Sequence, residues 1–346
     1  MRIGLIGCGR HGRFAVVPAM REHSTKSELV AAADMNPEFM NQVEGIARYA
    51  DAREMMAKER LDAVYIATLV ETHGPLALAA FEAGLHVVSE KPMAESAKVC
   101  RAMVDGARKA GRCLAVTFEN RYHPHHRTIR RWIDAGYLGT IQAIHVQEFW
   151  DGHKTFGPLS ERRARLMQRS GGLDCGIHRL DLVRYFCEGN WKTLHALGAW
   201  FGEAMEKPPH IGILGRLDNG VLVTVNASMG YAASIEPRPM NEILVIAGTK
   251  GVVSLAIDEP TPDAFVHTAA RVRISSERLC ETIPIVELDH PKAIGMLLDD
   301  FAGLIEGSKS SPPELAMGED GLAAQIATEW ANDSAVADRK NCHDRY

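Results

Sequence analysis

The sequence predicts a two-domain α/β protein, in which a doubly wound parallel sheet precedes an α+β domain with a mainly antiparallel open sheet. Three observations support this fold class. A glycine motif follows the first apolar run, apolar runs alternate with helical patterns over residues 1–121, and hairpin turns recur after that. A chain of 346 residues is also too long for one typical hydrophobic core and suits two.

The glycine motif stands between the first apolar run and a helical pattern. Gly7, Gly9 and Gly12 have the G-x-G-x-x-G spacing. Gly7 permits a tight turn, Gly9 lets a pyrophosphate approach the backbone, and Gly12 lets helix and strand pack closely. The start of the following helix offers N–H groups and a positive dipole end to phosphates, so a dinucleotide is the expected ligand. Pro18 requires the backbone of this helix to adapt.

Asp34 ends the second predicted strand, which covers Leu29–Ala33. A carboxylate about 20 residues beyond the glycine motif is placed to accept hydrogen bonds from the adenosine ribose. It repels a 2′-phosphate, and residues 35–37, Met-Asn-Pro, supply no arginine to bind one. The sequence therefore favours NAD over NADP as the cofactor.

The rest of the first 121 residues reads as helices alternating with buried parallel strands. A helix-rich stretch is expected up to about residue 60, and Gly84 and Gly111 end two later helices. Continuous apolar runs are typical of parallel strands covered on both faces. The further strands are expected at 61–67, 85–89 and 113–118, and the later helices at 72–82 and 94–110.

The second part of the chain changes to an antiparallel pattern. The turns 218–220 and 248–251 contain residues that tolerate positive φ, as hairpins require. We expect a dinucleotide-binding domain at 1–121, a substrate-binding and oligomerisation domain at 122–310, and a helical tail at 311–346 that packs back on the first domain. Helices are expected at 128–135, 176–186, 293–305 and 319–337, and strands at 141–150, 191–201, 211–217, 221–229, 242–247, 252–257 and 271–274.

Composition excludes several classes of protein. The net charge of −5 and the absence of a basic block argue against nucleic acid as a partner. The N-terminus resembles no signal peptide, and no apolar run reaches membrane-spanning length. Seven scattered cysteines without a C-x-x-C pair indicate reduced thiols in a cytoplasmic protein, with neither a disulfide framework nor a metal site.

The chain contains a set of motifs in a fixed order, which are Gly7-Cys-Gly-Arg-His-Gly12, Ala67-Thr-Leu-Val-Glu-Thr-His73, Glu90-Lys-Pro92, Asp174-Cys-Gly-Ile-His178 with Asp181, Gly248-Thr-Lys-Gly251 and Pro312-Pro-Glu-Leu-Ala-Met-Gly-Glu-Asp-Gly321. This ordered set resembles the glucose-fructose oxidoreductase, inositol dehydrogenase and rhizopine catabolism (Gfo/Idh/MocA) family. The resemblance implies a Rossmann domain that binds NAD, oxidation of a secondary alcohol of a sugar, cyclitol or related polyol, and a homodimer or homotetramer formed through the C-terminal sheet.

The same resemblance implies three catalytic residues, Lys91, Asp174 and His178. In the family, the lysine of the E-K-P triplet contacts nicotinamide and substrate, and a cation there stabilises charge on the reacting oxygen. His178 is the expected general base, because an unperturbed histidine pKa of about 6.5 suits proton transfer near neutrality. Asp174, four residues earlier on one helix face, would bind a second hydroxyl or help set the charge of His178. Asp181 would orient the imidazole or solvate the helix.

The remaining cofactor-binding expectations come from the other motifs. Arg10 and His11 lie within the glycine motif, and Glu90 precedes Lys91. Thr68 is expected near the diphosphate or ribose, and His73 near the following helix. Arg121 either touches cofactor or substrate or serves as a structural arginine at the domain junction, and the sequence favours neither. The chain departs from the family pattern at Leu69, which replaces a proline, and in the short spacing between Gly172 and Asp174.

Several residues remain without an assigned role. The cluster His123, His125 and His126 lacks the spacing of a metal site, and hydride transfer requires no metal. The sequence does not choose among the candidates for lining the substrate pocket, which are Tyr122, Trp150, His153 and the Arg162–Arg169 segment.

Two other functions stay open at this point. A glycosidase that oxidises its substrate transiently would hold NAD tightly and show no net cofactor turnover. A dinucleotide-binding sensor would bind NAD(H) without acid–base residues, which the presence of Lys91, Asp174 and His178 disfavours. The sequence fixes neither the sugar or cyclitol nor the physiological direction of the reaction, because one scaffold serves many substrates.

Overall fold

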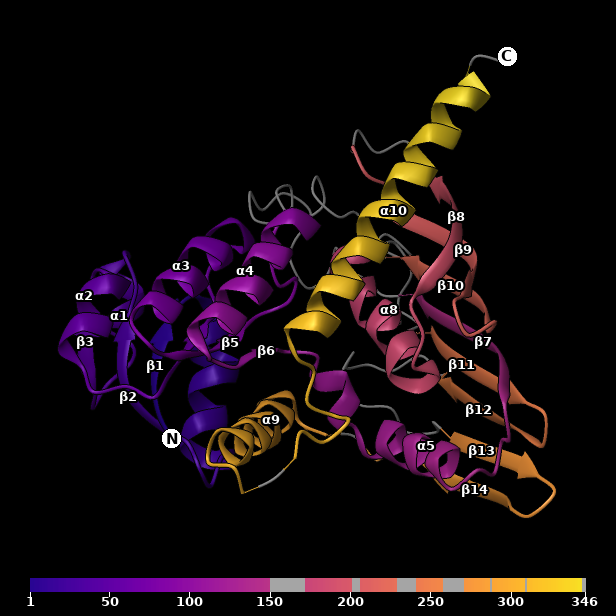
Figure 1. The fold of residues 1–346 in the computed structure, drawn as a ribbon, viewed down its shortest axis with the longest axis horizontal. Coiled ribbons are helices and arrows are strands. Elements are labelled where there is room, and N and C mark those ends of the chain that lie inside the picture. The colour runs from indigo at the N-terminus through magenta and orange to yellow at the C-terminus, as the bar shows by residue number, and fades with distance from the viewer. Residues whose placement is uncertain are drawn as a thin grey trace, which may run out of the picture. The chain divides into compact units, whose positions relative to one another are not determined.

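The chain folds into two compact units, seen in a computed structural model (Figure 1). Unit 1 comprises Met1–His123 and Leu288–Gln325, and unit 2 comprises Pro124–Glu287 and Ile326–Tyr346. The domain boundaries expected from the sequence, 121/122 and 310/311, stay a prediction. The structure describes residues 1–149, 172–200, 206–228, 241–257, 271–286, 288–308 and 310–343.

Unit 1 is built on a parallel sheet. Within its described residues, six strands are ordered β3-β2-β1-β4-β5-β6. All four residues of β4 are buried, as expected for a strand covered on both faces. Residues 47–49 form a strand where the sequence analysis expected helix, because three residues are too few to show a periodicity. The strands are β1 (Arg2–Ile6), β2 (Glu28–Ala33), β3 (Ala47–Tyr49), β4 (Ala63–Ile66), β5 (His86–Ser89) and β6 (Leu114–Val116).

Helices cover both faces of this sheet. In Figure 1, α2, α3 and α4 lie on one side of the sheet and α9 lies on the other. η1 and η2 contact α9. Apolar side chains of α9, among them Leu297 and Phe301, share a core with Ile3 and Leu5 of β1. The helices are η1 (Gly12–Val16), η2 (Ala19–His23), α1 (Pro37–Met40), α2 (Ala52–Lys58), α3 (Val70–Glu82), α4 (Ala97–Ala110), η3 (Glu119–Tyr122) and α9 (His290–Ile305).

The helix that follows the glycine motif does adapt to its proline. It is continuous from residue 10 to residue 23, but η1 and η2 are π-helical stretches on either side of Pro18. The N–H of Val17 donates to the carbonyl of Gly12, five residues back. Because proline has no N–H to donate, the wider turns carry the helix past it without a break.

Unit 2 is built on a mainly antiparallel sheet. Within its described residues, eight strands are ordered β14-β13-β12-β11-β7-β10-β9-β8, and only β7 and β10 pair in parallel. Both predicted hairpins are present, and Gly220 has φ 93° in the first. β14 was not predicted, because it is short and mostly exposed. The strands are β7 (Ile141–Phe149), β8 (Trp191–Ala199), β9 (His210–Leu217), β10 (Leu222–Ser228), β11 (Asn241–Gly248), β12 (Gly251–Ile257), β13 (Arg271–Ser276) and β14 (Cys280–Pro284).

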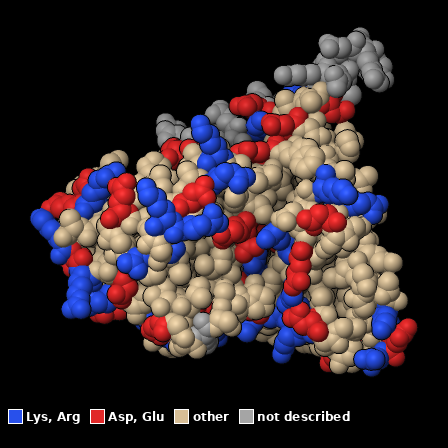
Figure 2. All heavy atoms as spheres, in the orientation of Figure 1, with Lys and Arg blue, Asp and Glu red and all other residues tan. Residues whose placement is uncertain are grey.

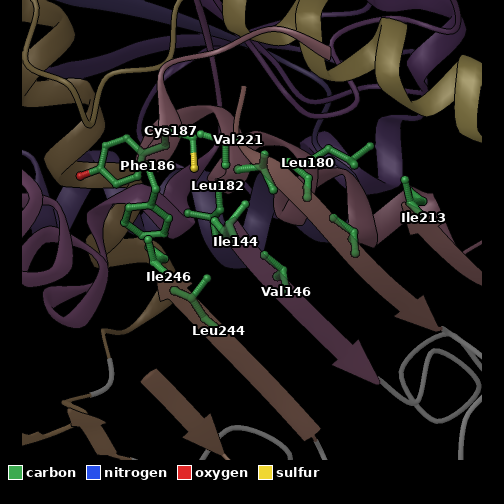
Figure 3. Packing of buried hydrophobic residues seen from close by; sticks show 14 of the residues in the cluster. Ile144, Val146, Leu180, Leu182, Phe186, Cys187, Ile213, Val221, Leu244 and Ile246 are labelled. Atoms are coloured by element: carbon green, nitrogen blue, oxygen red, sulfur yellow. The ribbon is translucent and has the colours of Figure 1, made fainter. Parts of the chain in front are cut away.

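Three helices cover one face of the second sheet. They are α5 (Pro124–Asp134), α8 (Leu173–Cys187) and the unit 2 part of α10 (Gly318–His343). Figure 3 shows Leu180 and Phe186 of α8 packed on Ile144 and Val146 of β7. Burial alternates along β9 and β10, so these strands bury one face only. The fold class expected from the sequence is confirmed.

The surface carries charges of both signs. Over the face drawn in Figure 2, lysine and arginine side chains are interspersed with aspartate and glutamate. No helix in the described ranges is both long and apolar enough to cross a bilayer.

Candidate functional site

The glycine turn has the geometry that its sequence predicts. Gly7 has φ 102°, and a Cβ there would lie 2.6 Å from the carbonyl oxygen of Ala67. A Cβ at Gly12 would collide with the carbonyl oxygen of Gly7. A Cβ at Gly9, in contrast, would meet no protein atom within 4 Å. Two glycines are therefore required by close packing, and the third keeps the backbone open to a ligand.

Asp34 lies at the end of β2 and contacts the glycine turn. Its Oδ2 accepts a hydrogen bond from the N–H of Cys8 at 2.6 Å, and its Oδ1 accepts one from the N–H of Asn36 at 2.8 Å. Burial, reinforced by the charge of Asp34, raises the pKa of the Cys8 thiol to about 12, so the thiol stays neutral. Arg10 is exposed at the start of the helix.

Glu90 is the centre of a buried polar cluster in unit 1. Its Oε1 lies 2.8 Å from His11 Nε2 and accepts a hydrogen bond from the Tyr65 hydroxyl at 2.5 Å. Burial alone would raise the pKa of Glu90, but His11 and the hydrogen bonds outweigh it and lower the pKa to about 2. Burial likewise opposes the charged form of His11, but Glu90 raises its pKa above the ordinary value.

Lys91 follows Glu90 in the turn after β5. The backbone N–H of Lys91 donates to Glu90 Oε2 at 3.2 Å. Lys91 is half-buried, and its peptide bond to Pro92 is cis. The carboxylate of Glu90 thus contacts both the backbone of Lys91 and the side chain of His11. The sequence motifs predict that Glu90, Lys91 and His11 lie at the cofactor, and the structure brings these three residues together.

His73 joins the two loops that carry Thr68 and Lys91. It is 2% exposed, with Nδ1 lying 3.1 Å from the carbonyl oxygen of Pro92 and Nε2 3.3 Å from that of Thr68. Burial lowers its pKa, which favours the neutral imidazole. The hydroxyl of Thr68 accepts a hydrogen bond from Thr72 at 2.7 Å.

Arg121 contacts the C-terminal part of unit 1. Its guanidinium donates to the carbonyl oxygen of Pro313 at 3.1 Å and lies 3.5 Å from Asp320. Tyr122, a candidate for the pocket, is buried with its hydroxyl donating to Asp300 at 3.2 Å. The other pocket candidates, Trp150, His153 and the Arg162–Arg169 segment, lie outside the described residues.

In unit 2, α8 carries the predicted acid–base residues. Asp174 and His178 lie one helical turn apart and are 5% and 8% exposed. Asp181, which is 1% exposed, follows on the same helix. A Cβ at Gly176 would lie 2.7 Å from the Cβ of Ala227. The central glycine of this motif therefore lets α8 approach β10 closely.

Arg179 forms a charged cluster that the sequence analysis missed. Its guanidinium donates to Glu242 Oε1 at 2.8 Å and to Glu148 Oε1 at 2.6 Å, tying α8 to β11 and β7. Burial raises the pKa of Glu242, although Arg179 opposes this. His126 Nε2 lies 3.9 Å from Glu242, and its ring contacts that of His125. Among the described residues, no group of three or more His, Cys, Asp or Glu is arranged to hold a metal ion.

Two family models match most of the chain. Residues 1–118 match the oxidoreductase family with an NAD-binding Rossmann fold, and residues 126–254 match the GFO/IDH/MocA C-terminal domain. The chain belongs to the Gfo/Idh/MocA oxidoreductase family.

Named members of the Gfo/Idh/MocA family are similar to this chain. The inositol 2-dehydrogenase of Rhizobium meliloti (strain 1021) is 30% identical over 98% of both chains. The D-apiose dehydrogenase of Paraburkholderia graminis is 31% identical over 73% of this chain and 67% of that protein. An oxidoreductase from Agrobacterium radiobacter, solved with NAD+, L-tartaric acid and magnesium, superposes with a TM-score of 0.81, covering 97% of this chain and 96% of that one. At 22% identity, this last likeness concerns the fold.

The described residues of this family member fit a dinucleotide. The backbone is open at Gly9, the helix that starts at Arg10 presents N–H groups, and Asp34 stands at the end of β2. These features depend on local spacing, so the sequence could show them. Arg179, Glu148 and Glu242 are far apart in the chain, and the one available signal was a charged residue within the apolar pattern of α8.

Proposed function

We propose that this family member is an NAD(H)-dependent dehydrogenase that oxidises a secondary alcohol of a sugar, cyclitol or related polyol. The arrangement of Asp174 and His178 on α8 carries this proposal, because it supplies a hydrogen-bonding carboxylate and a titratable base one turn apart. The relatives named inositol 2-dehydrogenase and D-apiose dehydrogenase support the substrate class.

Each predicted catalytic residue has a distinct proposed role. His178 accepts the proton of the reacting hydroxyl, and Asp174 accepts a hydrogen bond from a neighbouring hydroxyl, which orients the ring. Lys91 stabilises the negative charge that develops on the oxygen as its proton leaves. The nicotinamide, when bound, takes up the hydride. Positioning by Asp174 and Lys91 lowers the entropic cost of reaching this geometry.

The proposed cofactor is NAD in preference to NADP. Asp34 places a carboxylate beside the glycine turn, and the following residues, Met35 and Asn36, offer no positive charge to a 2′-phosphate. The cofactor contacts expected from the sequence are proposed for the glycine turn, Asp34 and Lys91.

Among the described residues, the face of the unit 2 sheet opposite α5, α8 and α10 exposes apolar side chains, which supports a homo-oligomer. Large apolar side chains are exposed there on four strands, beside buried neighbours that face the helices. We propose a homodimer or homotetramer formed through this face, since a contiguous apolar surface favours self-association. A chain that sediments as a monomer would contradict this. The side chains are Leu197, Leu214, Leu222 and Val252, exposed by 64%, 53%, 41% and 41%.

An absorbance assay tests the proposed reaction. Purified protein is mixed with NAD or NADP and a panel of cyclitols, aldoses, amino sugars and sugar acids, and reduced cofactor is measured. Sustained NADH formation with one class supports the dehydrogenase and identifies its substrate class. If NAD binds but no class yields NADH, the reaction proposed here is wrong, and chromogenic glycosides become the next substrates to test.

Replacement of the proposed base sharpens the assay. His178→Ala is expected to lower kcat by about a hundredfold or more, the usual contribution of a general base. NADH affinity should stay within a few fold, because His178 has no proposed cofactor contact. A variant with unchanged kcat would remove His178 from the mechanism.

A further inference from the structure

His11 connects two halves of the nucleotide-binding sheet. It follows β1, whereas its partner Glu90 follows β5, and the strand order reverses between β1 and β4. Ligands of open α/β sheets bind outside the carboxyl ends of the strands at such a reversal. The His11–Glu90 contact therefore spans the place where a dinucleotide is expected to bind. Neither residue is one of the glycines that the motif requires.

Glu90 links the side chain of His11 to the backbone of Lys91. The two oxygens of this carboxylate bind different groups, because Oε1 meets His11 and Tyr65 while Oε2 accepts from the N–H of Lys91. The Glu90 side chain is 10% exposed and that of His11 is 29% exposed. A carboxylate that is this buried requires a nearby cation or several donors to stay charged.

The charges around His11 come from four surrounding elements. His290 of α9 packs edge-on against its ring, with centroids 5.4 Å apart, and also lies 3.5 Å from Glu119. Glu90 and Glu119 favour the charged imidazole, whereas Lys91 opposes it. The groups that face His11 are Glu90 and Lys91 after β5, Tyr65 of β4, Glu119 of η3 and His290 of α9.

We propose that His11 is a positioning residue whose protonation controls NAD(H) affinity by holding the glycine turn to the turn that carries Lys91. This inference rests on the proposed function, since it assumes that the glycine turn binds NAD(H). With His11 charged, Glu90 is paired and both turns are held in one arrangement. When His11 loses its proton, the buried carboxylate loses its cation, the contact weakens, and the two turns hold the dinucleotide less well.

The test is the pH profile of NADH binding, followed by cofactor fluorescence between about pH 6.5 and about pH 9.5. Wild-type affinity should fall roughly five- to tenfold as pH rises, the size expected for one charge-assisted hydrogen bond. His11→Gln keeps a donor but cannot titrate, so its profile should be flat. The matched control is His23→Gln, because His23 is 28% exposed and lies 3.7 Å from Asp289. That variant should keep the wild-type profile.

A second measurement guards against misfolded variants. Histidine NMR signals give the titration of His11 directly, with the assignment taken from the signal that His11→Gln removes. Glu90→Gln should shift this titration to lower pH by removing the facing charge. A signal that titrates at the same pH in both proteins would overturn the proposal.

The outcomes separate this inference from the proposed function. NADH binding with the same sloping profile in wild type and His11→Gln would overturn the role of His11 alone, as would a flat wild-type profile. A wild-type chain that binds no NADH at any pH would overturn the cofactor proposal and this inference together.

Discussion

The two units each contain a buried charged cluster, and the two clusters are built in opposite ways. In unit 1, Glu90 is a carboxylate paired with His11, a cation that can lose its proton. In unit 2, Arg179 is a permanent cation shared between Glu148 and Glu242. The comparison shows that a buried ion pair can be sensitive to pH or independent of it. Loss of a proton from His11 removes the cation of the first cluster, whereas Arg179 stays charged throughout the ordinary pH range.

The largest effect is expected from removing the permanent cation. Arg179→Met leaves Glu148 and Glu242 buried without their guanidinium, and should lower the free energy of unfolding by about 3 to 5 kcal/mol. Denaturation in urea measures the loss. Arg179→Lys is the matched control, which keeps the charge but not the paired donors and should lose less. A loss below about 1 kcal/mol in the methionine variant would mean that this cluster is not needed to hold α8 on its sheet.

The titratable cluster should instead show a pH-dependent loss. The pKa of Glu90 is lowered to about 2, so its contribution to stability is fully present above the ordinary glutamate pKa and disappears as pH falls from there through the lowered pKa. The pKa of His11 is raised, so its contribution is present below the ordinary histidine pKa and disappears as pH rises through the raised value. Glu90→Gln should therefore cost about 2 to 3 kcal/mol at neutral pH and much less in acid.

Urea denaturation at a series of pH values checks this difference. The difference in free energy of unfolding between wild type and Glu90→Gln should become smaller at acid pH, where Glu90 is protonated. It should also become smaller at alkaline pH, where His11 is deprotonated. A gap that stays constant at every pH would contradict the contrast between the two clusters, because Glu90 would then act without titrating.

A smaller effect is expected from the hydroxyl that supports Glu90. Tyr65→Phe removes its hydrogen bond to the carboxylate and should lower the free energy of unfolding by about 1 to 2 kcal/mol. The Tyr65 hydroxyl also lies 3.1 Å from Thr117 Oγ1, which itself donates to the carbonyl oxygen of Ser89 at 3.2 Å, so Thr117→Val is a control that removes neutral contacts only. If both variants lose equal stability, the charge of Glu90 does not strengthen the Tyr65 contact.

The smallest effect is expected from an exposed ion pair. Lys58 Nζ lies 2.6 Å from Glu54 Oε1 on α2, with side chains 62% and 47% exposed. Glu54→Gln should change the free energy of unfolding by less than about 0.5 kcal/mol, because water screens the pair. A larger loss, seen in the same denaturation assay, would show that burial does not distinguish the clusters from surface pairs.

The parts that the sequence predicted well depend on neighbours along the chain. The glycine turn, the carboxylate of Asp34 and the shared face of Asp174 and His178 follow from spacing within one strand, turn or helix. The contacts of Arg179 join segments 31 and 63 residues apart, and no periodicity indicates such pairings. Strand β3 was missed for a related reason, because it takes its place from pairing with β2 and lacks an apolar run of its own.

His73 shows the limit of a motif in another way. The sequence grouped it with the cofactor-binding residues, and its role at the cofactor stays a prediction. Its backbone neighbours in the structure include the carbonyl oxygens of Pro92 and Thr68, which lie 19 and 5 residues away. A motif indicates that a residue has a role at a given position in the fold. The contact partners of a buried ring depend instead on how separate loops pack together.

The path of the chain through the two units has a consequence for folding during synthesis. Unit 1 lacks α9 until Leu288–Gln325 has been made, although residues 1–123 are translated first. Unit 2 lacks Ala327, Ala331 and Ala335, all fully buried in its core, until α10 leaves the ribosome. In many proteins the N-terminal domain folds before the next domain is translated. This chain cannot follow that order, because both cores are completed late and almost together.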